Sequence, residues 1–237
     1  MSQRIGTVAA IARYPVKSMA AEPVQALDLH WSGANGDRQY GFVQSGNKGR
    51  FPWLTGRELA SLLSHRPAYD NPEDPRLSPL TVTTPEGERL AVTDPALAAR
   101  LSTEAGREVS LIQIGRGVFD AMPVSLASTA GLAAIAAAHG SPLDARRFRL
   151  NIIIESEMRD AEWQGRRLAF GTPEGAAVLV NHGIPRCVMI TIDPDTLARD
   201  PSVMKTVAKQ FANQAGQYAA TARLGPIRAG DAVFLAD

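Results

Sequence analysis

The segment that says most about the fold reads Arg146-Arg147-Phe148-Arg149-Leu150-Asn151-Ile152-Ile153-Ile154. Side chains alternate between the two faces of a strand, so a strand over residues 147–154 has one apolar face that we interpret as core: Phe148, Leu150, Ile152 and Ile154. Its other face begins with Arg147, Arg149 and Asn151 and becomes apolar at Ile153. This pattern is typical of a strand whose entrance lines a polar site, although a basic face in contact with solvent has the same pattern.

A second alternating segment contains the only cysteine of the chain. It reads Ile184-Pro185-Arg186-Cys187-Val188-Met189-Ile190-Thr191-Ile192, and we expect a strand over residues 186–192. A lone Cys187 forms no internal disulfide, which leaves core residue, nucleophile, sulfur carrier or ligand to one metal as its roles. Arg186 can hold an anion near the sulfur and favours the thiolate. Because Pro185 interrupts the hydrogen-bond ladder, Cys187 could instead stand at the mouth of a barrel.

The remaining chain is rich in turn residues, with 20 Gly and 16 Pro, and this favours short strands. Further strands are expected at residues 3–13, 23–30, 38–45, 80–83, 88–92, 108–114 and 231–235. Residues 66–79 hold four prolines and are expected to form a loop.

Helices are predicted mainly from their ends. Asp94-Pro95 and Asp200-Pro201 each supply an N-cap and a first-turn proline, and Ser128 opens an alanine-rich helix. We expect these helices to end near Gly106, near Ala215 and at Gly140, respectively. A short helix is also expected at about 56–65. The sequence therefore predicts a mainly β fold with several helices (α+β), arranged as a small-stranded barrel or sandwich.

The composition argues against several classes of partner. The net charge of the 237 residues is only +1, which gives no reason to expect a nucleic-acid or membrane partner. No apolar run approaches the ~20 residues of a membrane helix, and the chain begins with neither a signal nor a transit peptide. One cysteine agrees with a reducing compartment, so we expect a cytoplasmic protein.

Several charged groups stand where strands end, and each could be either a site or a solvated turn. They are Lys17-Ser18 after a Tyr-Pro-Val turn, Asp37-Arg38 after Asn-Gly, and the pair Thr55 and Arg57, which frames a helix N-terminus that favours an anion. The four histidines show no metal-ligand spacing, and only His182 merits a test. Phosphate-loop and dinucleotide-binding motifs are lacking.

In this order along the chain, the fragments resemble the MOSC family, named for the C-terminal domain of molybdenum cofactor sulfurase. The likeness is greatest to longer members such as the mitochondrial amidoxime-reducing component and its bacterial relatives. It rests on seven motifs in register: Tyr14-Pro15-Val16-Lys17-Ser18, Gly36-Asp37-Arg38, Leu54-Thr55-Gly56-Arg57, Arg147-Phe148-Arg149-Leu150-Asn151, Arg186-Cys187, Gly216-Gln217-Tyr218 and Gly225-Pro226-Ile227-Arg228-Ala229-Gly230-Asp231. Two positions depart from the family pattern, since Leu150 replaces a proline and Ile184 stands where a further cysteine is common.

The resemblance implies a MOSC-type β-barrel core over residues 116–237, preceded by a smaller N-terminal β-barrel-like subdomain over residues 1–115. It also implies a molybdenum cofactor (molybdenum bound to molybdopterin), with Cys187 as the metal ligand and catalytic residue. The implied cofactor contacts are Lys17, Ser18, Arg38, Ser128, Arg149, Asn151 and Arg186. Thr55 and Arg57 would stand at the entrance or behind these residues.

The activity implied by this resemblance is reduction of N-hydroxylated compounds such as amidoximes, hydroxylamines and N-hydroxylated bases. A chain with one cysteine cannot bind a four-cysteine iron–sulfur cluster, so electrons would come from a separate ferredoxin, cytochrome b5 or flavoprotein. Two alternatives stay open. One is a sulfur or cofactor carrier that uses a Cys187 persulfide, and the other is a non-catalytic module that binds a phosphorylated ligand.

Overall fold

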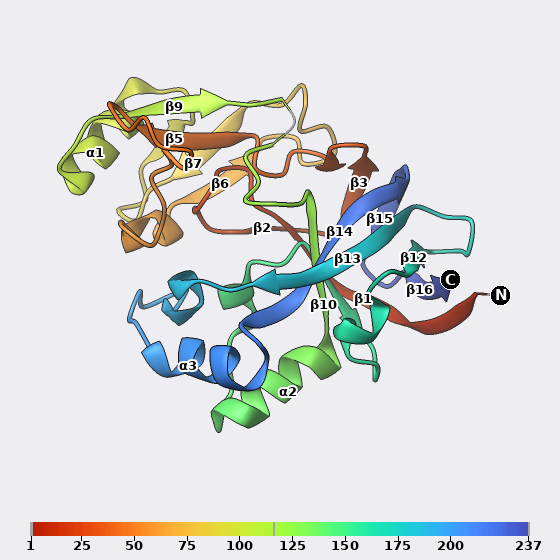
Figure 1. The fold of residues 1–237 in the computed structure, drawn as a ribbon. Helices are drawn as coiled ribbons and strands as arrows, with labels where there is room; N and C mark the ends of the chain where they lie inside the picture. Colours follow the sequence, from red (N-terminus) through yellow and green to blue (C-terminus); the bar gives the residue numbers. More distant parts are fainter. Residues whose placement is uncertain (1, 116, 237) are drawn as a thin grey trace.

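Seven strands close into a β-barrel in the computed structural model, which describes residues 2–115 and 117–236 (Figure 1). Around the barrel the strands are β11 (Ile152–Glu155), β10 (Val124–Ser128), β14 (Gln214–Arg223), β13 (Ala177–Pro185), β12 (Arg167–Phe170), β16 (Ala232–Ala236) and β1 (Gln3–Arg13). Pairing of β1 with β11 closes the ring, and β2 (Glu22–Val24) adds to the end of β1. The predicted mainly β fold with a barrel is confirmed.

The barrel interior is filled by alternate residues of its strands. Leu126, Ile152, Ile154 and Val178 are fully buried there, and they pack with Trp163, which lies in the 3-10 helix η3 (Asp160–Trp163). Each such side chain removed from water contributes about 1.5–3 kcal/mol. Closure of the ring gives each of the seven strands a hydrogen-bonded neighbour on both sides, and β2 forms an additional pair with the end of β1.

A second lobe, at the upper left of Figure 1, is built from short sheets around its own core. β5 (Tyr40–Gln44) pairs with β9 (Val109–Gln113), and β6 (Arg66–Tyr69), β7 (Leu80–Thr83) and β8 (Arg89–Ala91) form a three-stranded sheet. Helix α1 (Pro95–Ala105) and the 3-10 helix η1 (Ala60–Ser64) cover it. Phe42, Leu62, Leu97 and Leu101 are buried in this core.

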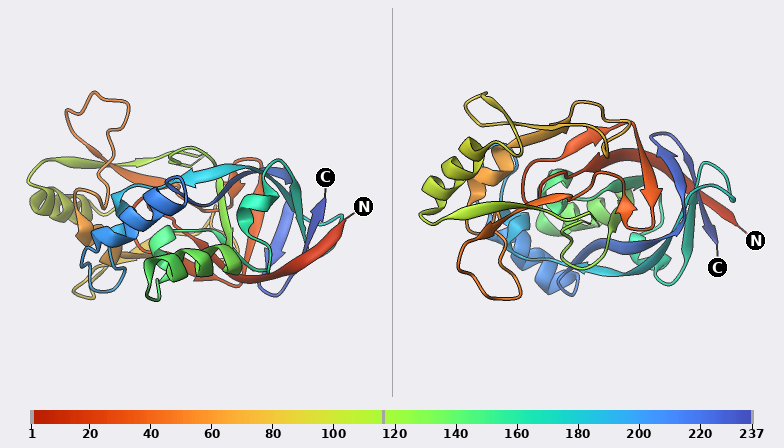
Figure 2. Two further views of the ribbon diagram at one scale, coloured as in Figure 1. Left: turned by 60° about the horizontal axis from the view of Figure 1, so that its bottom comes forward. Right: turned by 90° about the horizontal axis from the view of Figure 1, so that it is seen from above.

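Strand pairing joins the two halves of the sequence. β1 and β2 belong to the barrel sheet, and β3 (Ala26–His30) pairs with both β4 (Gly33–Ala34) and β15 (Gly225–Arg228). β1 also pairs with β16, so both ends of the chain lie together, away from the second lobe (Figure 2). The division at 115/116 stays a prediction about domains, while the hydrogen-bonded sheets cross it.

Helices α2 (Thr129–His139) and α3 (Pro201–Gln210) pack side by side outside the barrel (Figure 1). The predicted N-caps are confirmed, because the side chains of Asp94, Ser128 and Asp200 each accept a hydrogen bond from a first-turn backbone N–H. Gly106 and Gly140 end α1 and α2 in the left-handed conformation. Within the described part of the chain, no helix combines the length and apolar character needed to cross a bilayer.

The predicted strand over residues 147–154 is wrong at its beginning. Asp144 accepts a hydrogen bond from the Arg146 N–H at 2.8 Å and starts the 3-10 helix η2 (Ala145–Phe148). Arg149 then adopts φ +52°, so regular alternation starts only with β11 at Ile152. The apolar half of the prediction is confirmed, because Phe148, Leu150, Ile152 and Ile154 are all buried.

The predicted strand over residues 186–192 is also wrong. β13 ends at Pro185, and Cys187 precedes the 3-10 helix η4 (Val188–Thr191), where Ile190 packs against α3 instead of into the barrel. Other boundaries differ as well. α3 ends at Gln210 because Ala212 and Asn213 have positive φ, β6 forms inside the predicted loop 66–79, and helix 56–65 shortens to η1. The sequence patterns did not predict strands β4, β10, β12, β13, β14 and β15.

Candidate functional site

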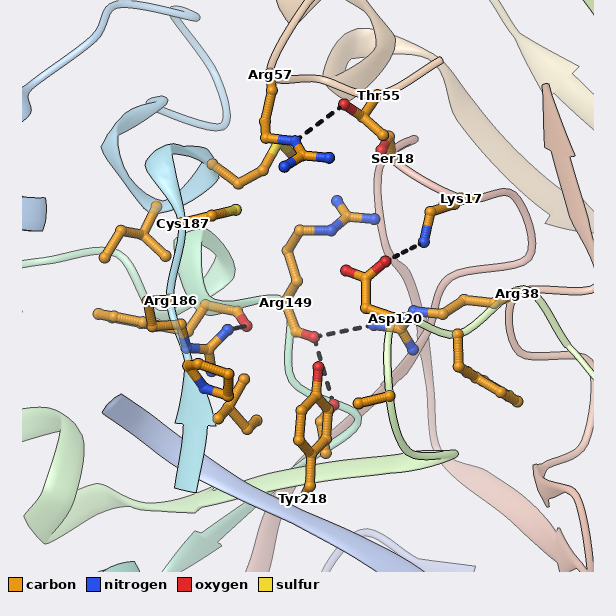
Figure 3. Close-up of a pocket in the computed structure, with 18 of the residues that line it drawn as sticks. Lys17, Ser18, Arg38, Thr55, Arg57, Asp120, Arg149, Arg186, Cys187 and Tyr218 are labelled. Carbon is orange, nitrogen blue, oxygen red and sulfur yellow. Dashed lines mark hydrogen bonds and ion pairs between the residues drawn. The ribbon is translucent and has the colours of Figure 1, made fainter. Parts of the chain in front are cut away.

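A cavity of about 310 Å³ lies where segments of both lobes meet (Figure 3). Of the residues that the motifs single out, the structure brings the following together around this cavity: Lys17, Ser18, Arg38, Thr55, Arg57, Arg149, Arg186 and Cys187. They come from turns and strand ends that are far apart in the sequence. The cavity therefore exists only through the tertiary fold.

The lining of this cavity is strongly cationic. Six Lys and Arg residues line it, namely Lys17, Arg38, Arg57, Arg147, Arg149 and Arg186, whereas Asp120 is the one carboxylate among its described lining residues. A concave surface of one charge sign focuses the electrostatic potential and attracts a ligand of the opposite sign. The arrangement thus favours an anionic ligand.

Three of the lining residues have a backbone conformation that side chains other than glycine rarely adopt. Ser18, Arg38 and Arg149 have φ of 67°, 48° and 52°, and they make up half of the six non-glycine residues with positive φ in the described chain. Such residues cost on the order of 1–3 kcal/mol each and cluster at functional sites. Here the strain lies at residues that direct polar side chains toward one cavity.

One side of the cavity, the lysine wall (Lys17, Ser18, Arg38 and Asp120), pairs its cations with carboxylates. The Lys17 ammonium lies 2.5 Å from Asp120 Oδ1 and also donates to the Val118 carbonyl at 3.2 Å. Arg38 forms an ion pair with Asp37, which is fully buried and accepts a hydrogen bond from the Tyr14 N–H.

The surroundings of Lys17 and Arg38 shift the pKa values of these two side chains in opposite directions. Burial lowers the pKa of Lys17, and the neighbouring Arg38 and Arg149 act in the same direction, although Asp120 opposes them. Burial would also lower the pKa of Arg38, but Asp37, Tyr14 and Asp120 together outweigh it, so the pKa of Arg38 is raised. Arg38 therefore keeps its charge, and the Lys17 ammonium is the less stable cation of this wall.

The other side, the cysteine wall (Arg149, Arg186 and Cys187), holds its cations without carboxylates. Arg186 donates from Nε to the Ala215 carbonyl at 2.7 Å and from Nη1 to the Phe148 carbonyl at 2.8 Å. The Arg149 guanidinium lies over the Tyr14 ring at 4.4 Å and makes no hydrogen bond or ion pair with the described residues. Burial lowers the pKa of both arginines to about 10.

Arg149 occupies the middle of the site. In Figure 3 its side chain extends into the cavity between Cys187 and the Lys17–Asp120 pair. Its backbone carbonyl accepts a hydrogen bond from Arg38 at 3.2 Å, which ties the two walls together. A guanidinium with five free N–H donors in this position can bind an anion such as a phosphate or carboxylate bidentately.

Cys187 is exposed and stands just beyond the end of β13. Its exposure excludes the core-residue interpretation and agrees with the alternative that Pro185 leaves the thiol at a barrel mouth. Among residues 2–115 and 117–236, no three His, Cys, Asp or Glu side chains gather as a metal site would require.

Two predicted cofactor contacts lie outside the cavity lining. Asn151 is buried behind it, where its Oδ1 accepts hydrogen bonds from the Ser125 N–H at 3.1 Å and hydroxyl at 2.8 Å. Ser128 is fully buried, and its hydroxyl caps α2 and lies 3.2 Å from Asp160. The structure therefore gives both residues structural partners, and their contact with a cofactor stays a prediction. His182 is exposed and packs edge-on against Tyr218.

Sequence reasoning missed three polar residues of the site: Asp120, Ser125 and Tyr218. Asp120 lies in the segment between β9 and β10, which carries no local motif, so its sequence offers no signal. Tyr218 belongs to the Gly216-Gln217-Tyr218 motif and lines the cavity, and that motif could have marked it as a site residue. Burial raises the pKa of the Tyr218 phenol, which therefore stays protonated.

The fold and site together define a closed β-barrel protein with a cationic cavity and an exposed thiol on its rim. The sequence profile of the MOSC domain matches residues 115–234, and that of the MOSC N-terminal beta barrel domain matches residues 5–115. The chain therefore belongs to the MOSC family, as the motifs indicated.

The solved structure of YuaD agrees with this assignment at the level of the fold. YuaD protein from Bacillus subtilis is 16% identical, with 99% of this chain and 98% of that chain covered and a TM-score of 0.54. YiiM from Geobacillus stearothermophilus is 19% identical over 49% of this chain and 55% of that chain, with a TM-score of 0.38. A comparison with curated proteins gave no match.

Proposed function

We propose that this protein is a molybdenum-cofactor-dependent reductase of N-hydroxylated compounds such as amidoximes, hydroxylamines and N-hydroxylated bases. Membership in the MOSC family is consistent with a function related to the molybdenum cofactor. The observation that carries the proposal is the cysteine wall. It sets an exposed thiol on the same cavity as Arg149, whose guanidinium makes no hydrogen bond or ion pair in the described chain.

The residues of the cavity fit this cofactor chemically. A thiolate is a soft ligand and suits a metal that dithiolene sulfur already holds. Arg149, Lys17 and Ser18 offer donors for the pterin and its phosphate, and the Ser18 hydroxyl makes no hydrogen bond within the described chain. Arg186 donates hydrogen bonds to two backbone carbonyls, so it would act on the bound cofactor mainly through its charge. When bound, the cofactor supplies two-electron redox chemistry at the N–O bond.

The reaction needs a source of electrons that this chain does not contain. Reduction of R–NH–OH to R–NH₂ and water consumes two electrons and two protons. We propose that a separate ferredoxin, cytochrome b5 or flavoprotein delivers the electrons, and that the reaction takes place in the cytoplasm. The exposed position of Cys187 supports access from outside the protein.

Metal analysis combined with one substitution tests the proposal. Protein made in a host that synthesises the cofactor should carry about one molybdenum and one pterin per chain, and it should reduce benzamidoxime with reduced methyl viologen. Cys187→Ser removes the proposed metal ligand, so it should lower that rate by on the order of a hundredfold or more. Val188→Ala is the matched control, since Val188 is its exposed neighbour and should leave the rate unchanged. Wild-type protein without molybdenum or pterin would contradict the proposal.

The exposure of Cys187 also supports a second candidate, a sulfur or cofactor carrier that uses a persulfide. Native mass spectrometry separates the two functions, because a carrier should show a mass gain of one sulfur atom that Cys187→Ser abolishes. If the protein is instead a non-catalytic module that binds a phosphorylated ligand, Cys187→Ser should leave the binding of that ligand intact.

A further inference from the structure

The Lys17 side chain is a buried cation of the cavity, and the protein itself supplies its counter-ion. The side chain of Lys17 is 8% exposed, whereas that of its partner Asp120 is 60% exposed. Both acceptors of the ammonium, Asp120 Oδ1 and the Val118 carbonyl, belong to the segment between β9 and β10. A buried cation is thus paired with a carboxylate on an exposed segment.

Backbone hydrogen bonds hold this segment at Val118 and Val124 but not between them in the described chain. The Val118 N–H donates to the Arg38 carbonyl at 2.7 Å, and Val124 begins the pairing of β10 with β14. For residues 119–122, the one hydrogen bond or ion pair in the described chain is that of Asp120 with Lys17. Loss of that contact would leave residues 119–122 without a hydrogen bond or ion pair in the described chain, with apolar packing such as that of the Phe119 ring against Gly117 still to be given up.

Asp120 occupies an ammonium of the cavity lining that an anionic ligand would also use. It is the one carboxylate among the described lining residues, and the cations Lys17, Arg38 and Arg57 act together to lower its pKa, although burial opposes them. A carboxylate and a phosphate oxygen compete for the same ammonium donors, and two anions cannot share one compact ammonium without repulsion.

We propose that Asp120 is a built-in competitor, which occupies the anion position at Lys17 until a phosphate-bearing ligand displaces it and residues 119–122 swing away. The inference deepens the proposed function because it concerns the same cavity, yet it requires only an anionic ligand and no molybdenum. Competition of this kind lowers the apparent affinity by the fraction of molecules in the open state. A ligand must bind the open state tightly enough to offset this reduction, and ligands with more than one negative charge, such as phosphomonoester dianions and pyrophosphate, gain most from the cationic cavity.

Pyrophosphate titration of the full chain, made in a host unable to synthesise the cofactor, tests the proposal directly. If Asp120 closes the site about nine-tenths of the time, Asp120→Asn should bind pyrophosphate about tenfold more tightly than the wild type in isothermal titration calorimetry. The matched control is Glu86→Gln, which removes an exposed carboxylate from an ion pair with Arg100 in the second lobe. Its affinity should equal that of the wild type.

Limited proteolysis gives a second, independent readout. Saturating pyrophosphate should speed chymotrypsin cleavage after Phe119 in the wild type, and Asp120→Asn should be cleaved fast without ligand. Equal or weaker binding by Asp120→Asn, or slower cleavage of this segment with ligand, would overturn the proposal because the segment would then hold the ligand. A result in which Asp120→Asn binds more tightly but the wild type never carries molybdenum would reject the proposed function alone.

Discussion

The two walls of the cavity hold their cations in different ways. The lysine wall neutralises Lys17 and Arg38 with Asp120 and Asp37, whereas the cysteine wall holds Arg186 on backbone carbonyls and Arg149 on the Tyr14 ring. A carbonyl or an aromatic ring orients a guanidinium without cancelling its charge. The excess positive charge of the cavity therefore comes mainly from the cysteine wall, next to the thiol.

Within the cysteine wall, Arg186 and Arg149 differ in whether they stabilise the fold or are available to bind a ligand. Arg186 connects β14 and the η2 segment through its hydrogen bonds to Ala215 and Phe148, so it supports the fold. Arg149 makes no such bond in the described chain, and burial of its charge opposes folding. Two neighbouring arginines should thus respond to substitution in opposite ways.

Arg186→Met should destabilise the protein by about 2–3 kcal/mol, because two buried carbonyl groups lose their donors. Urea unfolding of the ligand-free chain measures this difference in the free energy of unfolding. Arg107→Met is the control, since Arg107 is exposed and pairs only with Glu58, and it should change stability by less than about 0.5 kcal/mol. Equal effects of the two substitutions would show that Arg186 does not brace the barrel.

Arg149→Met should leave the free energy of unfolding unchanged or raise it, and should weaken pyrophosphate binding about tenfold, which corresponds to ~1.4 kcal/mol. The physical reason is that a ligand loses a bidentate donor while the fold loses no hydrogen bond. Met has the same difficulty as Arg at φ +52°, so backbone strain does not change. Calorimetric titration and urea unfolding of the same preparation check both parts. A stability loss as large as that of Arg186→Met would remove the distinction between these residues.

The smallest expected effect concerns pH and Asp120. Lys17, Arg38 and Arg57 outweigh burial and lower the pKa of this carboxyl, so the folded state favours the ionised form. Its stabilisation is present above the unfolded pKa of about 3.9 and is lost as pH falls through the lower folded pKa. The wild type should exceed Asp120→Asn by a few tenths of a kcal/mol at pH 7, since the side chain is 60% exposed. Urea unfolding at pH 7, 5 and 3 should show this difference shrinking only at the lowest pH.

Local chemistry made part of the fold predictable. Asp94, Ser128 and Asp200 were recognised as helix starts because a capping side chain binds N–H groups only two or three residues away. The predictions of strands over residues 147–154 and 186–192 were wrong because other contacts, near and far along the chain, compete with strand formation. Asp144 starts a 3-10 turn that competes with the strand, and Ile190 finds its apolar partners on α3, which begins eleven residues later.

The site was predictable where a motif marked it. Lys17, Arg38, Arg149, Arg186 and Cys187 stand in motifs and all line one cavity. Asp120 could not be predicted, because its importance depends on a Lys17 side chain that lies 103 positions earlier in the chain. Asn151 stands in a motif too, but its side chain lies behind the cavity on Ser125, so its contact with a cofactor stays a prediction.

By itself, the sequence determined the family, the helix caps, the apolar core positions and the set of cationic residues around a single cysteine, since each depends on residue type and short spacing. Only the tertiary structure decided that β1 closes the barrel against β11, that Cys187 is exposed, and that Lys17 is paired while Arg149 is not. The reason is physical. Strand pairing, burial and ion pairs depend on which distant segments share a surface, and no local pattern of residues specifies those contacts.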